Sequence, residues 1–215
     1  MKKTLLTISA ALAVGLLATL VFFFDLDQRV IDLFTSSTSN NRGTLTITSR
    51  NGSANITLNS EDLGSTPLND FEIDSGEHDI TITRESASEG FYNPFQVPIT
   101  VAPSTQSVID IEIGPSSYKH GFVLYYLDDT SKSDNTGTLY IDPTPFDARI
   151  TVDSEIHTEQ LIQLNEGEYQ VKFEREGYED LTVPVVINPG LNLNLRTYQM
   201  PIPTDINSAQ SDDAD

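Results

Sequence analysis

Apolar and polar residues alternate along most of the chain after residue 35. A period of two is typical of strands that bury one face, and no segment of this region repeats its apolar residues at a helical spacing. The pattern therefore predicts an all-β protein built from short strands. Asn51-Gly52 separates the first two alternating runs and predicts a hairpin turn between them. The clearest alternating runs are 45–47, 56–58, 80–82, 97–101 and 109–113.

The N-terminal segment has a different pattern. Residues 4–24 contain no charged side chain, and about 20 helical residues span the apolar core of a bilayer. Lysines precede this run and aspartates follow it, which favours an extracytoplasmic location for the rest of the chain. The bulky residues 22–24 favour a retained anchor over a cleaved signal peptide. We therefore expect a single-pass cell-membrane protein whose bulk is extracytoplasmic.

Apolar residues keep a helical spacing beyond the predicted membrane span. Residues 1–34 are therefore expected to form one N-terminal transmembrane anchor helix with an amphipathic extension. We interpret the extension as a collar at the lipid surface, with contact to a partner helix as the alternative. Residues 35–42 are small and polar and predict a linker.

Two stretches of the chain resemble each other. Residues 43–61 read GTLTITSRNGSANITLNSE and residues 137–155 read GTLYIDPTPFDARITVDSE, with nine identical positions at a constant offset. The similarity resumes in later segments and ends with 97–103 against 183–189, and the second copy has the shorter loops. A unit of this size indicates a duplicated small domain and not a solenoid repeat.

The duplication predicts two tandem small β-sandwich domains, each of roughly six strands. Each copy carries the whole strand pattern, so we expect the two to fold independently. The expected boundaries are 43–128 for the first domain with an extra strand, 129–136 for a linker, 137–203 for the second domain, and 204–215 for a disordered acidic tail.

Short motifs recur in the same order in both copies. Copy one has Asn51-Gly52-Ser53-Ala54, Gly64-Ser65-Thr66-Pro67, Ser75-Gly76-Glu77-His78 and Gly90-Phe91-Tyr92. Copy two has Pro145-Phe146-Asp147-Ala148, Glu166-Gly167-Glu168-Tyr169 and Gly177-Tyr178. Copy one lacks the proline of the first turn, and copy two lacks the Gly-x-x-Pro stretch. In this order the motifs resemble those of the PEGA domain family, over residues 43–113 and 137–198. The resemblance implies non-catalytic β modules of extracytoplasmic, envelope-associated proteins with an interaction role.

Four of these motif residues have a predicted structural role. Gly76 and Gly167 are expected at turns that need a positive φ. Tyr92 and Tyr178 are expected to cap the core, with the ring buried and the hydroxyl at the edge.

Composition narrows the function further. The chain has no cysteine, which excludes disulfides and a lipidated cysteine anchor. Its net charge of −20 at pH 7 resides in the part after residue 34 and opposes binding to nucleic acid or anionic lipid.

Candidate chemistry is sparse. The three histidines, His78, His120 and His157, are far apart in sequence, and no nucleophile, nucleotide or zinc-protease motif is present. Residues 128–135 are the best calcium candidate, but they lack the spacing of a calcium loop and are interpreted as a solvated linker. We therefore predict no catalytic residue, no cofactor and no metal, and a protein that is not an enzyme.

Residues 118–127, which read YKHGFVLYYL, do not belong to the repeat and are apolar on both faces of a strand. We interpret them as an added strand of the first domain or as packing between the domains. The alternative is an exposed aromatic patch, with Phe122, Leu124 and Tyr126 as possible partner contacts.

These features together favour a membrane-anchored extracytoplasmic spacer or interaction protein with tandem PEGA-like modules. Its N-terminal helix would hold it in the membrane, and its partner would be a protein of the cell envelope, not a nucleic acid. The alternative is a structural subunit of an envelope complex or filament that assembles through the N-terminal helix. An enzyme or a carbohydrate binder that uses the acidic surface is a less favoured alternative.

Overall fold

The computed structural model describes residues 41–50, 52–86, 90–129 and 135–203. Regular structure in these residues is entirely β, so the all-β prediction is confirmed. No helix within the described ranges is long and apolar enough to cross a membrane. The predicted anchor helix 1–34 and the predicted tail 204–215 lie outside the described residues and stay predictions.

Fifteen strands make up the described part of the chain. Copy one contains β1 (Arg42–Thr48), β2 (Ala54–Leu58), β3 (Glu61–Ser65), β4 (Leu68–Asp74), β5 (Gly76–Arg84), β6 (Phe95–Val101) and β7 (Gln106–Ile113). The added strand β8 (Lys119–Asp128) follows. Copy two contains β9 (Thr136–Thr144), β10 (Arg149–Val152), β11 (Glu155–His157), β12 (Leu161–Asn165), β13 (Gly167–Glu174), β14 (Leu181–Ile187) and β15 (Leu191–Tyr198).

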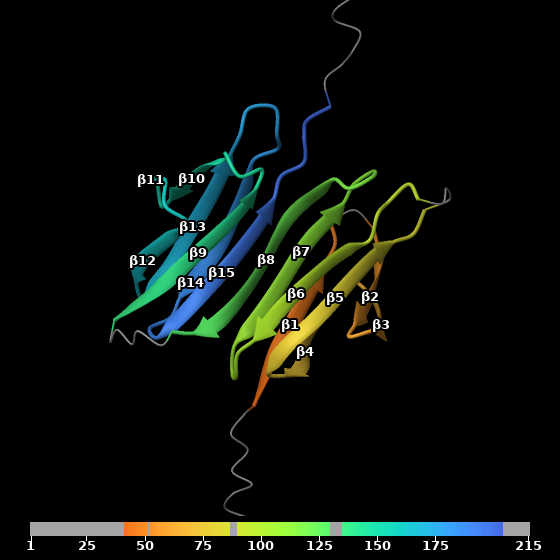
Figure 1. The fold of residues 1–215 in the computed structure, drawn as a ribbon, viewed down its shortest axis with the longest axis horizontal. Coiled ribbons are helices and arrows are strands. Elements are labelled where there is room, and N and C mark those ends of the chain that lie inside the picture. The colour runs from red at the N-terminus through yellow and green to blue at the C-terminus, as the bar shows by residue number, and fades with distance from the viewer. Residues whose placement is uncertain (1–40, 51, 87–89, 130–134, 204–215) are drawn as a thin grey trace, which may run out of the picture. The chain divides into compact units, whose positions relative to one another are not determined.

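The strands form three sheets (Figure 1). The large sheet has the order β12-β9-β15-β8-β7-β1-β4. Each copy also has its own small sheet, β3-β2-β5-β6 in copy one and β11-β10-β13-β14 in copy two. In both copies the first strand pairs antiparallel with the fourth and parallel with the seventh. The duplication therefore extends to the topology, with seven strands in each copy where the sequence predicts about six.

The hairpin expected at Asn51-Gly52 does not form. Strands β1 and β2 lie in different sheets, and Asn51 itself is outside the described residues. The apolar side chains of β1, such as Leu45, face Ile56 of β2 across the first core, which requires the chain to cross between layers. Tight hairpins close instead after β2 and β10, at Asn59-Ser60 and Asp153-Ser154, where both turn residues have a positive φ.

Strand β8 joins the two copies. It pairs antiparallel with β7 on one side and with β15 on the other, so the large sheet is continuous through both copies. Gly121 allows β8 to approach β7 closely. Its φ is 133°, and a Cβ at this position would collide with the backbone oxygen of Asp110.

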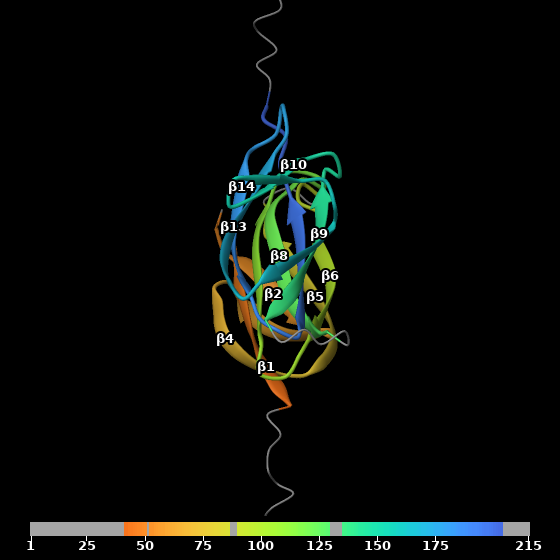
Figure 2. The same ribbon diagram turned by 90° about the vertical axis from the view of Figure 1, so that its left-hand side faces the viewer.

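The two hydrophobic cores lie on opposite faces of the large sheet. Val123 and Tyr125 of β8 point into the first core, whereas the alternate residues Phe122, Leu124 and Tyr126 point into the second. Figure 2 shows β5 and β6 on one side of β8 and β13 and β14 on the other. Because β7 and β15 run in the same direction, a pseudo-two-fold axis along β8 relates the copies. Burial on both faces explains why residues 122–127 of β8 are all apolar.

The predicted roles of the shared glycine and tyrosine residues are mostly confirmed. Gly76 has a φ of 132°. Tyr92 and Tyr178 are half-buried, not fully buried. The guanidinium of Arg84 lies 4.3 Å from the ring centre of Tyr92, and that of Arg175 lies 4.5 Å from the ring centre of Tyr178. The same cation–π pair thus covers the equivalent tyrosine in both copies.

Candidate functional site: a groove between the copies

Each small sheet covers one face of its own half of the large sheet and reaches only the nearest strand of the other half, where Val108 of β7 packs against the second core and Tyr198 of β15 against the first. The opposite face of each half is otherwise uncovered, and we call these the open face of copy one and the open face of copy two. The open face of copy one carries the outward residues of β1, β4 and β7, which are Thr44, Thr46, Thr48, Asp70, Glu72, Gln106, Asp110 and Glu112. The open face of copy two carries those of β9, β12 and β15, which are Thr136, Thr138, Tyr140, Asp142, Thr144, Leu161, Gln163, Asn165, Asn192, Asn194, Arg196 and Tyr198.

Polar side chains on the open face of copy one form hydrogen bonds with one another. Gln106 donates hydrogen bonds to the hydroxyl of Thr46 (3.3 Å) and to the carboxylate of Asp70 (3.1 Å). Arg50 donates two hydrogen bonds to the carboxylate of Asp110, which also accepts one from Thr48. This network leaves the face polar and rich in carboxylates.

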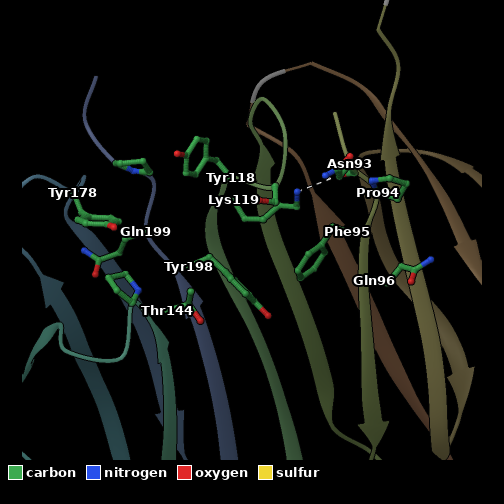
Figure 3. Close-up of a pocket in the computed structure, with 13 residues that line it drawn as sticks. Asn93, Pro94, Phe95, Gln96, Tyr118, Lys119, Thr144, Tyr178, Tyr198 and Gln199 are labelled. Atoms are coloured by element: carbon green, nitrogen blue, oxygen red, sulfur yellow. Dashed lines mark hydrogen bonds between the residues drawn. The ribbon is translucent and has the colours of Figure 1, made fainter. Parts of the chain in front are cut away.

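At one end of the open face of copy two, the surface is hollowed into a groove of about 560 Å³. Figure 3 shows side chains from both copies and from the start of β8 around a common space. A volume of this size is within the range of ligand-binding pockets. The groove is lined by Asn93, Pro94, Phe95, Gln96, Ser117, Tyr118, Lys119, Thr144, Pro145, Tyr178, Tyr198, Gln199 and Pro201.

Aromatic rings and one amine dominate the groove. The rings of Phe95 and Tyr198 meet edge to face with centres 5.3 Å apart, and burial raises the pKa of Tyr198. Burial lowers the pKa of Lys119, whose Nζ donates a hydrogen bond to the carbonyl oxygen of Asn93 at 3.2 Å. That single bond leaves the amine with further donors for another group.

Gln199 adds a buried polar group at the edge of the groove. Its Nε2 donates to the carbonyl oxygens of Phe173 (3.2 Å) and Glu179 (2.8 Å). Its Oε1 has no hydrogen-bond partner among the described residues. The two bonds fix the orientation of the amide and tie the end of β15 to the second small sheet.

The charge of the groove differs from that of the chain. None of its lining side chains is a carboxylate, although the protein has 32 Asp and Glu residues. The described lysines and arginines also gather toward this end of the strands, with Arg42 at the start of β1 as the exception within the described ranges. They are Arg50, Arg84, Lys119, Arg149, Lys172, Arg175 and Arg196.

Large apolar side chains stand exposed around the groove. Phe91, Tyr118 and Ile202 are about half-exposed, and Phe146, in the turn after Thr144 and Pro145, is 86% exposed. Exposed apolar residues that gather in one place indicate an interaction surface.

The three residues predicted as possible partner contacts lie elsewhere. Phe122, Leu124 and Tyr126 are buried in the second core, and the hydroxyl of Tyr126 donates to the carbonyl oxygen of Val186 at 2.8 Å. They therefore form no exposed patch, and packing between the copies accounts for their apolar character. A contact of these residues with a partner stays a prediction.

His78 occupies a structural position. A ring nitrogen of His78 lies 2.8 Å from the backbone oxygen of Asp74, and the hydroxyl of the equivalent Tyr169 donates to the backbone oxygen of Asn165. Both side chains are half-buried. Within the described ranges, no three His, Asp or Glu side chains form a group that could hold a metal ion. Residues 130–134 of the calcium candidate lie outside these ranges.

The sequence alone does not predict the groove, because its lining residues come from five separate segments at the ends of strands. The sequence distinguishes Tyr118 and Lys119 in the non-repeat segment and Pro145 and Tyr178 in the repeat motifs, but it gives no sign that these segments meet. The topology brings Tyr118 and Lys119 beside Tyr178 and Tyr198 of copy two.

The protein thus consists of two copies of one β module, which are joined through the shared strand β8. The model of the PEGA domain matches residues 42–116 and 136–199, and the chain belongs to the PEGA domain family. None of the curated proteins matches the sequence. Among solved structures, the chain is similar to "The Bacillus anthracis TIE protein", with 10% sequence identity and a TM-score of 0.24, over 75% of this chain and 34% of that chain. The chain thus spans about a third of the length of that protein.

Proposed function

We propose that this protein is a membrane-anchored, extracytoplasmic interaction protein that holds its binding surface at a distance from the membrane. Its two PEGA modules serve as a non-catalytic spacer. The observation that carries the proposal is the position of the groove relative to the start of β1. Arg42 begins β1 at one end of the strands, whereas Lys119 lines the groove at the other.

Strand length gives the scale of this spacer. β8 has ten residues, and a strand rises about 3.3 Å per residue, so roughly 30 Å separate its ends. An anchor that precedes Arg42 attaches at the end remote from the groove. The continuous pairing of β7, β8 and β15 supports a stiff unit, because bending between the copies would break strand pairs.

Family membership supports an interaction role over catalysis. PEGA domains are a family of non-catalytic modules, and this chain contains two of them. The groove supplies apolar surface, one amine and amide groups, which suit binding more than bond cleavage.

Cell fractionation tests the anchored location. The full chain with a C-terminal tag is expected in the membrane fraction, extracted by detergent and not by carbonate. Protease added to intact spheroplasts is expected to remove the tag. Recovery in the soluble fraction, or a mature N-terminus between residues 14 and 27, would contradict the proposal.

A helix replacement distinguishes the spacer from a subunit that assembles through its N-terminal helix. Residues 4–34 are replaced by an unrelated transmembrane helix, and proteins bound to the full chain are recovered after mild crosslinking. The spacer proposal expects the same proteins from both versions. Loss of those proteins on helix replacement would favour the complex or filament subunit.

A further inference from the structure

At one end of the open face of copy two, an exposed apolar ring adjoins an aromatic hollow. Phe146 is 86% exposed and follows Thr144 and Pro145, which line the groove. Further along this face, Tyr140 of β9 lies directly opposite Leu161 of β12, and these side chains are 37% and 65% exposed. Such cross-strand apolar pairs are normally covered by another layer.

The charge of this face suits contact between two copies of the chain. A net charge of −20 makes copies repel each other, so a self-contact needs a surface without excess negative charge. The outward residues of β9, β12 and β15 include one carboxylate, Asp142, and one cation, Arg196, which lie 3.9 Å apart. The open face of copy one carries several carboxylates and does not meet this requirement.

A charge pair also accompanies the exposed ring. Asp147 follows Phe146, and its half-exposed carboxylate contacts Arg175 at 3.0 Å. The groove offers the amine of Lys119 and has no carboxylate in its lining. A Phe146 side chain that enters the groove of another copy would bring its own Asp147 toward that Lys119.

A two-fold contact between identical chains requires a self-complementary surface. An exposed ring next to a hollow meets this requirement, because the ring of each chain can enter the hollow of the other. We propose that a second copy of this chain binds the open face of copy two, with Phe146 of each copy seated in the groove of the other. The inference rests on the proposed interaction role and names the partner.

Photo-crosslinking in the full chain tests this contact. p-Benzoylphenylalanine replaces Phe146 in one version and Ile156 in a control version, because Ile156 is 61% exposed on β11, in the second small sheet. Irradiation of membranes is expected to give a covalent dimer from position 146, with crosslinks at Tyr118 or Tyr198, and none from position 156. Absence of the dimer, or equal dimer from both positions, would overturn the proposal. Crosslinks from position 146 to a different protein would overturn self-association and leave the interaction role intact.

Two charge-reversal variants provide a test that does not depend on the ring. Lys119→Glu and Asp147→Lys, each carrying a different tag, are expected to dimerise poorly alone, because each homodimer has two like-charge contacts. Mixing them is expected to restore co-purification to the level of the unmodified chain, because both contacts in the mixed dimer join opposite charges. Phe146→Ser is expected to weaken dimerisation by at least about thirtyfold, because the dimer loses an aromatic hot spot at each of its two contacts. Failure of the mixed pair to recover, with each variant folded by circular dichroism, would overturn the proposal.

Discussion

The two copies share a topology and differ in what they expose. Leu45 and Leu139 occupy equivalent positions in β1 and β9, and both are fully buried. The next residue outward is Thr46 in copy one and Tyr140 in copy two. Thr46 accepts a hydrogen bond from Gln106, whereas Tyr140 stands exposed beside Leu161. Inward positions are restricted by the need to fill a core, and outward positions are free to acquire separate roles.

The shared strand limits how far the copies can be separated. The second core includes Phe122, Leu124 and Tyr126 of β8, and β8 lies outside the predicted second domain 137–203. The predicted independent folding of the two domains can therefore be tested on copy two with and without β8.

The largest expected effect comes from removing β8. Fragment 119–203 is expected to melt cooperatively, whereas fragment 137–203 is expected to lose cooperativity, because the strand that fills one side of its core is missing. Thermal unfolding followed by circular dichroism measures the difference. Within 119–203, Leu124→Ser should abolish cooperative melting as removal of β8 does. Val123→Ser should have little effect on melting, because the side chain of Val123 points toward the first core, which this fragment lacks. Equal melting of the two fragments would show that copy two folds independently.

The second-largest expected effect is the difference in destabilisation between substitutions at inward and at outward positions of the full chain. Leu45→Ala and Leu139→Ala are each expected to destabilise the protein by about 2–5 kcal/mol, because each leaves a cavity in a closed core. Tyr140→Thr, one residue away, is expected to change the free energy of unfolding by no more than about 0.5 kcal/mol. Chemical denaturation measures all three. A large loss for Tyr140→Thr would mean that the open face of copy two contributes to the monomer fold.

Local patterns predict the strands well and their connections poorly. In copy one the period of two finds β1, β2, β5, β6 and β7, because alternate burial is a property of each strand alone. It misses β3 and β4, whose side chains are mostly exposed. The Asn51-Gly52 signal fails because hairpin propensity is also local, whereas the choice of sheet depends on which apolar faces must meet. The motif order identifies the family, since PEGA motifs mark turns and strand starts that the fold itself requires.

The groove could not be predicted for a related reason. Tyr118 and Tyr178 stand out in the sequence for separate reasons, and nothing there links them to Tyr198. The pairing of β8 with β15 and the bridge between Tyr178 and Pro201 bring the three together. The apolar character of 118–127 is visible in the sequence, but exposure and burial on both faces produce the same pattern. Only the position of the small sheets on opposite faces of the large sheet shows that residues 122–127 are buried in two cores.

The third-largest expected effect concerns the cation–π pair that both copies contain, Arg84 with Tyr92 and Arg175 with Tyr178. Arg84→Gln and Arg175→Gln remove the cation above Tyr92 and Tyr178, and each is expected to cost about 0.5–1 kcal/mol, typical of a partly exposed cation–π pair. Arg84 also donates to the carbonyl oxygen of Ile113, so its replacement should be the more harmful of the two. Chemical denaturation of both variants checks the order, and a reversed order would show that the ion pair of Arg175 with Asp147 matters more than the bond to Ile113.

The smallest expected effect is a pH dependence at the junction of the copies. His120 of β8 is 4% exposed, and burial lowers its pKa. Glu179 of copy two lies 3.8 Å from Nδ1 and opposes that shift, as do Glu112 and Asp110, while Arg50 adds to it. Because the unfolded chain takes up the proton first, His120 reduces stability as the pH falls below about 6.5, its ordinary value.

Replacing His120 by glutamine should therefore make the protein less sensitive to mild acid. The midpoint of chemical denaturation, measured at pH 7.5 and at pH 5.5, should fall less in His120→Gln than in the unmodified chain. His78→Gln is the matched control, because His78 is half-buried and belongs to copy one alone. A larger fall in His120→Gln would mean that the protonated imidazole is stabilised by Glu179 across the junction, against the effect of burial.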